Sequence, residues 1–403
     1  MATPAPSTGR PARFGPVGVA QLVAVEIVAA ALLFVKGSDW IWLASAVAVT
    51  GILVFGKTRG LFWYVRGARL VRLAFRRRRD RKRPAAVAGL AAGVELSTVT
   101  ERGMSLGVAF DGTGWFAGLT VDSDEPPHLA FGVLSGILLG SGAPVSSVQL
   151  VTQTVPLTSS NLPQPEPPKA AEDDSDDGSG SGIKLEWRFP GDDATATQVM
   201  AGLPLFARRD AWFVVRLDVQ GAARIAAERG GGAVGIQRAL GGTVGRLMKG
   251  AKQVGVNLRP LDANGLHEAL RQSLGAESAE VEGVSEVAED WRSWKVGELD
   301  QVTFTLHGRL PGVEELRRLW TEVAELQSSF CAVSISLRRA SDRPVEKRLS
   351  VRCLVRVAAG HDDVNELVVQ LTKLAVDNKV KLRRCNGRQG PAAYASAASG
   401  GIF

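Results

Sequence analysis

The chain has 403 residues, and 48 Lys and Arg against 41 Asp and Glu give a formal net charge of +7. Twelve of the bases and one acid lie in residues 57–83, so the rest of the chain sums to −4. This mildly acidic remainder excludes nucleic-acid binding as a leading function, because that function needs a basic face on a folded module. The three cysteines, Cys331, Cys353 and Cys385, lack metal-ligand spacing and indicate reduced thiols, with no disulfide framework and no zinc site.

Two apolar stretches near the N-terminus predict a transmembrane hairpin. Residues 17–35 and 40–55 are each about long enough to cross a bilayer as a helix, and residues 36–39 form the turn between them. Residues 1–16 are then a cytoplasmic tail. A cleaved signal peptide is the alternative for the first stretch, but Glu26 and the second stretch count against it.

The basic stretch at residues 57–83 follows the hairpin directly and predicts its orientation. By the positive-inside rule, both termini and the main domain are expected in the cytoplasm, beside the cell (inner) membrane. Apolar and aromatic residues interleave with the bases, as in a juxtamembrane helix that contacts anionic lipids. The residues predicted to contact lipid headgroups are Arg76, Arg77, Arg78, Arg79, Arg81, Lys82 and Arg83.

Four residues within the predicted hairpin are candidates for packing between helices. Glu26 is an ionisable group in an otherwise apolar span, and such groups usually face a partner helix or a water-filled cavity. Ala44, Ala48 and Gly51 form a small-residue face on the second span that permits close packing. Packing within the hairpin and packing against another subunit both remain open for Glu26.

The remaining chain shows a change in composition at residues 156–182. This stretch is rich in Pro, Ser, Gly and Asp and predicts a disordered acidic linker. Before it, residues 98–155 form the first part of the cytoplasmic domain, and after it residues 183–275 form an α/β region. The expected elements are strands at 105–110, 114–121, 145–155 and 211–218, a helix carrying Ile236 to Val254, and a helix capped by Asp262.

Residues 300–385 have the clearest expected topology. Alternating and helical apolar patterns predict, in order, a strand at 301–306, a helix at 313–326, strands at 331–337 and 349–357, a helix at 364–376 and a strand at 379–383. This β-α-β-β-α-β order is typical of a ferredoxin-like unit. The strand, helix, strand order of residues 211–258 repeats that of 349–383, which is consistent with a weak internal repeat. The expected fold class is therefore an α+β or α/β cytoplasmic part with a ferredoxin-like C-terminal unit, preceded by the two-helix transmembrane hairpin.

No motif in the sequence assembles a catalytic, metal or cofactor site. Gly230, Gly232 and Gly235 spell G-x-G-x-x-G before a helix, but about a dozen residues separate them from the preceding strand, which a dinucleotide site does not allow. Asp122 and Asp124 form a D-x-D of the kind that holds a metal in nucleotide-sugar glycosyltransferases, and a solvated acidic turn explains them equally well. A membrane-anchored nucleotide-sugar glycosyltransferase is kept as the alternative function.

Several segments together resemble the EccE family of type VII secretion systems. They are the predicted hairpin with its basic flank, the strand pair at Met104–Trp115, the segment Trp212–Asp218, Arg229–Gly232, and Leu261–Ala263 before a helix. The resemblance implies a non-enzymatic structural subunit without cofactors, part of an inner-membrane secretion complex. It also implies EccB, EccD and the FtsK/SpoIIIE-type ATPase EccC as partners.

Overall fold

The computed structural model describes residues 13–14, 17–18, 45, 56–58, 61–80, 94–101, 103–121, 136, 138, 145–156, 206–276, 287–308, 312–339 and 349–401. The chain divides into two units, Met1–Arg79 and Asp80–Phe403.

The first unit is built around the basic helix α3, which spans Trp63–Asp80. Two short antiparallel pairs precede it, formed by β1 (Arg13–Phe14) with β2 (Val17–Gly18) and by β3 (Lys57–Thr58) with β4 (Leu61–Phe62). The second pair runs straight into the helix, since the Trp63 backbone N–H donates to the Gly56 carbonyl at 2.9 Å.

The second unit is organised by one antiparallel sheet of twelve strands. Its strands are β5 (Glu95–Glu101), β6 (Met104–Phe110), β7 (Gly114–Val121), β8 (Ser147–Pro156), β9 (Phe206–Asp218), β10 (Leu258–Pro260), β11 (Val287–Glu289), β12 (Trp294–Val296), β13 (Leu299–Leu306), β14 (Phe330–Arg339), β15 (Leu349–Gly360) and β16 (Leu382–Arg384). The order across the sheet is β11-β12-β13-β15-β14-β8-β9-β7-β6-β5, with β10 beside β7 and β16 beside β13.

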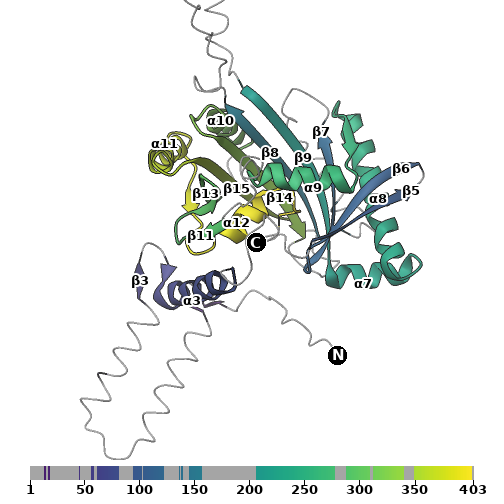
Figure 1. Cartoon of the computed structure of the whole chain (residues 1–403), viewed down its shortest axis with the longest axis horizontal. Helices are drawn as coiled ribbons and strands as arrows, with labels where there is room; N and C mark the ends of the chain where they lie inside the picture. The colour runs from purple at the N-terminus through teal and green to yellow at the C-terminus, as the bar shows by residue number, and fades with distance from the viewer. Residues whose placement is uncertain are drawn as a thin grey trace, which may run out of the picture. The chain divides into compact units, whose positions relative to one another are not determined.

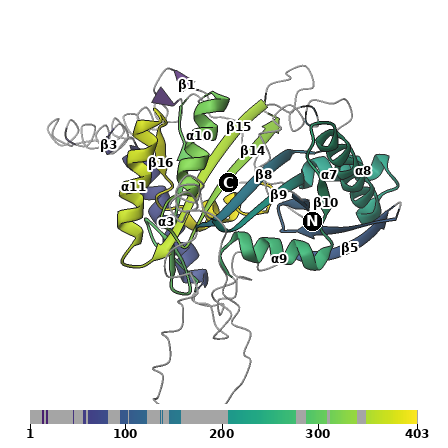
Figure 2. The same ribbon diagram turned by 90° about the horizontal axis from the view of Figure 1, so that it is seen from above.

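Helices cover both faces of this sheet (Figures 1 and 2). The helices of the second unit whose full length lies in the described ranges are α7 (Val219–Glu228), α8 (Gly232–Gln253), α9 (Ala263–Ser273), α10 (Val313–Ala324), α11 (Val364–Asp377) and α12 (Gln389–Ser396). Buried residues of α7, α8, α10 and α11 share one core with one sheet face, whereas those of α9 belong to a second core on the other face. Figure 2 shows α9 on the side of the sheet opposite to α7 and α8.

Two sets of four strands within the sheet repeat the same order, and we call each set a half; β5, β6, β11 and β12 lie outside both. One half runs β10-β7-β9-β8 and the other β16-β13-β15-β14, so each places its fourth, first, third and second strands side by side. Helices α7 and α8 connect β9 to β10, and α11 connects β15 to β16. The strand, helix, strand order that the sequence predicted as a weak repeat is thus part of a four-strand order that both halves share.

The predicted fold class is wrong, because the C-terminal elements do not form a separate ferredoxin-like unit. The second strand of that half, β14, pairs with β8 over eight residues, from Cys331 opposite Thr154 to Arg338 opposite Ser147. The physical reason lies in β14 itself, whose residues 330–337 are all buried on both faces. A strand buried in this way is a central strand, and leaving it at an edge would expose its unpaired backbone groups.

The predicted two-helix hairpin is not seen among the described residues. No helix in the parts of the chain that the structure describes is both long enough and apolar enough to cross a membrane. The two expected spans at 17–35 and 40–55 lie outside the described residues, apart from Val17, Gly18 and Ser45. The predicted linker at 156–182 also lies outside them, apart from Pro156.

The two faces of the central strands differ in chemistry. On the face toward α8 and α10, strands β8, β9, β14 and β15 present almost only apolar side chains, such as Leu150, Val215 and Val355. On the opposite face, the same strands carry buried polar residues. These are Ser147, Gln149, Gln153, Arg216, Ser334, Ser336 and Arg356. This polar face positions the candidate site.

Candidate functional site

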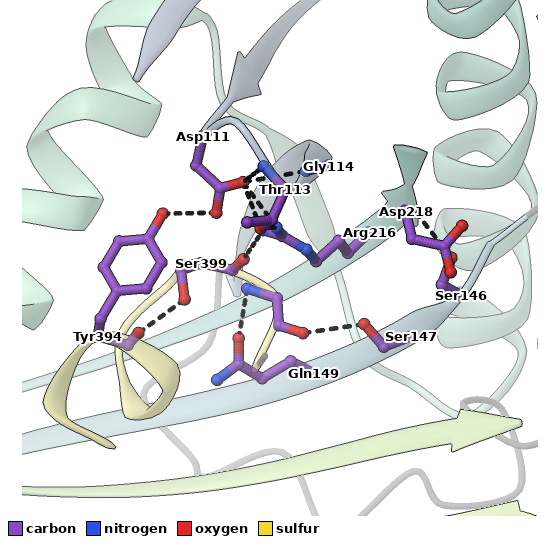
Figure 3. A network of polar contacts seen from close by, with 11 residues as sticks. Asp111, Thr113, Gly114, Ser146, Ser147, Gln149, Arg216, Asp218, Tyr394 and Ser399 are labelled. Atoms are coloured by element: carbon purple, nitrogen blue, oxygen red, sulfur yellow. Dashed lines mark hydrogen bonds and ion pairs between the residues drawn. The ribbon is translucent and has the colours of Figure 1, made fainter. Parts of the chain in front are cut away.

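The C-terminal segment, α12 followed by residues 397–401, lies on the polar face of the sheet. Apart from Gln389 and Tyr394 its residues are small, and most of the segment is buried, including Ala393, Ala398 and Ser399. Small side chains allow the backbone to approach the strands closely, so the polar side chains of the sheet can reach its peptide groups. Figure 3 shows this segment crossing the strands that carry Arg216 and Gln149.

An ion pair between Asp111 and Arg216 forms the centre of the polar contacts. Arg216 is fully buried on β9, and its Nη2 lies 2.7 Å from Oδ1 of Asp111, whose side chain is 8% exposed. Asp111 sits in the tight turn between β6 and β7, where Oδ1 also accepts from the Thr113 and Gly114 backbone N–H groups at 3.0 and 3.1 Å. The turn places the carboxylate because Asp side chains commonly bond to backbone N–H groups two and three residues on.

The same pair binds the C-terminal segment from two sides. Arg216 Nη1 donates to the Ser399 carbonyl at 2.9 Å, and the Tyr394 hydroxyl donates to Oδ2 of Asp111 at 3.0 Å. Figure 3 shows Asp111 between Tyr394 and Arg216. The ion pair therefore connects the β6–β7 turn, strand β9 and α12.

The charge states in this network follow from its geometry. Burial alone would raise the pKa of Asp111, but the hydrogen bond and charge of Arg216, together with Thr113, outweigh it and lower the pKa below 3.8. Burial, reinforced by the Asp111 carboxylate, raises the pKa of Tyr394. At neutral pH, Asp111 is therefore an acceptor and Tyr394 a donor.

Gln149 and Ser147 on β8 hold the end of the segment. The Gly400 N–H donates to Oε1 of Gln149 at 2.7 Å, and the Ser147 hydroxyl donates to the Gly400 carbonyl at 2.9 Å. Gln149 Nε2 also donates to the Ser334 hydroxyl at 2.7 Å and to the Ala395 carbonyl at 2.8 Å. Because Ser334 lies on β14, this glutamine connects the C-terminal segment to both central strands.

A second buried arginine occupies the corresponding strand of the other half. Arg356 lies on β15, the third strand of its half as β9 is of the first, and burial lowers the pKa of its guanidinium to about 9. Its Nη1 donates to Gln301 at 2.8 Å, its Nη2 donates to the Ser273 carbonyl at the end of α9, and its guanidinium lies 5.3 Å from the Phe330 ring. Arg216 contacts the Phe116 ring similarly, at 5.5 Å. Each half thus carries one internal arginine on the polar face.

These side chains bind one another and the chain's own backbone, which gives them a structural role. Among the described residues, no group of three or more His, Cys, Asp or Glu side chains is arranged to hold a metal ion. The three cysteines are buried, and burial raises the thiol pKa to about 11 for Cys331 and about 12 for Cys353. These two sulfurs are therefore thiols at neutral pH.

The structure places only part of the sequence-predicted site residues. Arg76, Arg77 and Arg78 lie in the last turns of α3, which also includes Arg79. Glu26, Ala44, Ala48 and Gly51, together with Arg81, Lys82, Arg83, Asp122 and Asp124, lie outside the described residues.

The glycines of the G-x-G-x-x-G motif have a local explanation. Gly230 and Gly232 adopt positive φ angles of 106° and 53° in the connection between α7 and α8. A Cβ on Gly235 would lie 2.5 Å from the Ala226 carbonyl oxygen, so only glycine allows α8 to pack this closely on α7. The motif builds the turn between two helices.

Sequence reasoning missed the buried network, although one signal was present. Arg216 stands inside the apolar strand Trp212–Asp218, where a lone charged residue indicates a buried partner. The partner itself could not be found, because Asp111 is 105 positions away and Tyr394 is 283 positions from Asp111.

Comparison with known proteins identifies the region around Arg216. Residues 205–306 match the family model described as "Putative type VII ESX secretion system translocon, EccE". The match runs from β9 to the end of β13 and includes Arg216, α8 and Gln301. No curated protein matches the chain. The resemblance predicted from the sequence motifs is thereby confirmed over residues 205–306, the stretch that is similar to the EccE family model.

Proposed function

We propose that this chain is a non-catalytic subunit of a membrane-associated type VII secretion complex. The observation that carries the proposal is the match to the EccE translocon family, because the matched stretch supplies β9 to β13 and the helices between them. The buried network supports a structural role, since its charged groups bind each other and the C-terminal segment. The glycosyltransferase alternative gains no support, because Asp122 and Asp124 lie outside the described residues.

Helix α3 supplies a surface suited to a membrane. With about 3.6 residues per turn, most of its large apolar residues fall on one side and most of its arginines on the other. The apolar residues exposed on it are Trp63, Tyr64, Leu70, Val71 and Phe75, of which Phe75 is 68% exposed. A basic amphipathic helix with aromatic residues is typical of a segment lying in the interface of an anionic membrane.

The proposed partners follow from the family. The complex would place this subunit beside EccB, EccD and the ATPase EccC, with anionic lipids against the basic side of α3. We place the sheet domain on the cytoplasmic side, where anionic lipids attract basic juxtamembrane segments. The domain then serves as a scaffold next to the secretion ATPase.

Neutralising the basic end of α3 should weaken its binding to anionic membranes. A synthetic peptide of residues 61–83 with Arg76, Arg77 and Arg78 replaced by Gln should partition into phosphatidylglycerol vesicles about 100-fold less than the natural sequence. Each base near an anionic surface contributes about 1 kcal/mol, and three therefore contribute about two orders of magnitude. Tryptophan fluorescence during vesicle titration measures the partition constant.

The matched control replaces the same three arginines with Lys, which keeps the charge and should preserve binding. Equal binding of the natural peptide to phosphatidylcholine and phosphatidylglycerol, or no loss with Gln, would contradict the electrostatic contact between α3 and the membrane.

A further inference from the structure

The outward face of α8 is a basic strip on the second unit. The inward face of this helix is buried against the sheet through residues such as Leu240, Val244 and Leu247. Arg238, Arg246, Lys249 and Lys252 are exposed, and with about 3.6 residues per turn they fall on one side of the helix. We refer to these four bases, with Gly242 and Gly245 between them, as the α8 strip.

No carboxylate balances the α8 strip from within its own helix, because α8 contains no Asp or Glu. The contacts of its arginines are to neutral groups: Arg238 donates to the Arg229 carbonyl at 3.2 Å, and Arg246 donates to the Thr243 hydroxyl at 3.3 Å. The helix in the corresponding connection of the other half, α11, carries the opposite balance, with two acids against one base. Of these two helices, only α8 therefore carries a net positive charge.

Gly242 and Gly245 have no side chains, so no side-chain bulk stands between the four charged side chains of the α8 strip. A Cβ on Gly245 would meet nothing within 4 Å, and one on Gly242 would meet only Arg229 Nη1 at 3.6 Å, an ordinary contact. No internal packing therefore requires glycine there, although each glycine in a helix costs about 1 kcal/mol relative to alanine. Gly235 in the same helix differs, since the Ala226 backbone excludes any side chain there. An external anionic surface can therefore approach the four bases closely.

We propose that the α8 strip is a second membrane contact, which lies on anionic lipid headgroups and orients the sheet domain against the bilayer. This inference rests on the proposed membrane association of the chain. The bases are distributed along the helix rather than gathered around one point, which fits a flat headgroup layer better than a single acidic side chain. Val234, which is 50% exposed, lies one turn before Arg238 on the same side of the helix and suits the same interface. Attachment elsewhere in the chain raises the local concentration of the strip at the membrane, so a weak contact suffices.

The test uses the full chain carrying a fluorophore at Gly245→Cys, reconstituted in nanodiscs that contain a headgroup-quencher lipid. The natural cysteines do not compete for the label because all three are buried. Quenching is expected with phosphatidylglycerol and not with phosphatidylcholine alone, and it should fall in high salt, which screens such contacts. The double substitution Arg246→Glu and Lys249→Glu should lower the contact population at least about tenfold, given about 1 kcal/mol per base.

Two controls use the other half of the same sheet. A label at Val369→Cys on α11, 67% exposed in the natural chain, should not be quenched. The matched charge change, Lys373→Glu with Lys379→Glu, should leave quenching at Gly245→Cys unaltered. Incorporation into nanodiscs reports membrane association independently, so loss of incorporation would count against the proposed function and not specifically against the α8 strip.

Three outcomes would overturn the inference while membrane association stands. They are equal quenching in both lipids, equal quenching on α11, and quenching that survives the double substitution on α8. Protection of the label only when other subunits of the complex are present would assign the strip to an acidic protein surface and would also overturn the lipid contact.

Discussion

Asp111→Asn is expected to lower the free energy of unfolding of the sheet domain by about 3–5 kcal/mol. The substitution removes the carboxylate that forms the ion pair with Arg216, which is fully buried. Breaking a buried pair from one side leaves the other charge uncompensated, and losses of this size are typical. Chemical unfolding followed by tryptophan fluorescence measures the change.

Arg216→Met provides the matched control and should be less damaging, at about 1–3 kcal/mol. Without the arginine, Asp111 keeps donors from the Thr113 and Gly114 backbone and from Tyr394, and it can also take up a proton. The double variant Asp111→Asn with Arg216→Met should be more stable than Asp111→Asn alone, because no buried charge remains in the pair. Simple addition of the two single losses would mean that the pair is not coupled.

The Asp111–Arg216 ion pair also predicts that the free energy of unfolding falls at acid pH. Because the pKa of Asp111 is lower in the folded chain than the ordinary value near 3.9, its ionisation stabilises the fold. That stabilisation is complete above about pH 4 and is lost as the pH falls through the lower folded pKa. Below about pH 4 the wild type should therefore lose stability more steeply than Asp111→Asn, and parallel curves would show that Asp111 titrates normally.

Removing residues 389–403 is expected to prevent the sheet domain from folding. The deletion takes away the partners of Gln149, Arg216 and Ser147 and the Gln389 side-chain carbonyl that accepts from the Thr303 N–H at 2.8 Å. Each of these four buried polar groups that loses a partner costs about 1–3 kcal/mol, so together they cost about 4–12 kcal/mol, which is comparable to the usual stability of a domain. Recovery of folded protein, measured by circular dichroism and size-exclusion chromatography, tests this expectation. Native-like yield would show that the segment is dispensable.

Two glycine-to-alanine substitutions test the packing of the C-terminal segment on the sheet without removing the segment. Gly400 has φ of +90°, and a Cβ there would lie 2.7 Å from Cβ of Arg216. Gly255 has a similar φ of +81°, with nothing within 4 Å of a Cβ. Gly255→Ala should therefore show only the backbone strain of about 1–2 kcal/mol, whereas Gly400→Ala should lose more. Equal losses would mean that residue 400 does not pack on the strand.

The sequence was sufficient to predict individual helices and strands, but not which strands pair with one another. Alternation of Val333, Ile335 and Leu337 predicted strand β14, and the three- and four-residue spacing of Leu316, Trp320 and Val323 predicted α10. These patterns reflect which face of an element is buried, and that information lies in the element's own residues. The partner of a strand depends on residues far away in the chain, so the pairing of β14 with β8 had no local signal.

The candidate site shows the same limit. The strands predicted at 105–110 and 114–121 leave Asp111 in the turn between them, as the structure has it, but its ion pair with Arg216 depends on the position of β9 in the sheet. Helix α12 was not predicted at all. Its sequence, Gln389–Ser396, consists mainly of small residues and has no apolar period, because it is buried on nearly every side. Such a segment can be recognised only once the structure shows the polar face of the sheet that it covers.

The most direct test of the proposed function is capture of the tagged full chain from gently solubilised membranes of its own cells, followed by native electrophoresis. The proposal predicts that the chain migrates in one large complex together with the EccC ATPase, EccB and EccD. Migration of the chain by itself, in membranes where those three subunits are assembled with each other, would contradict it.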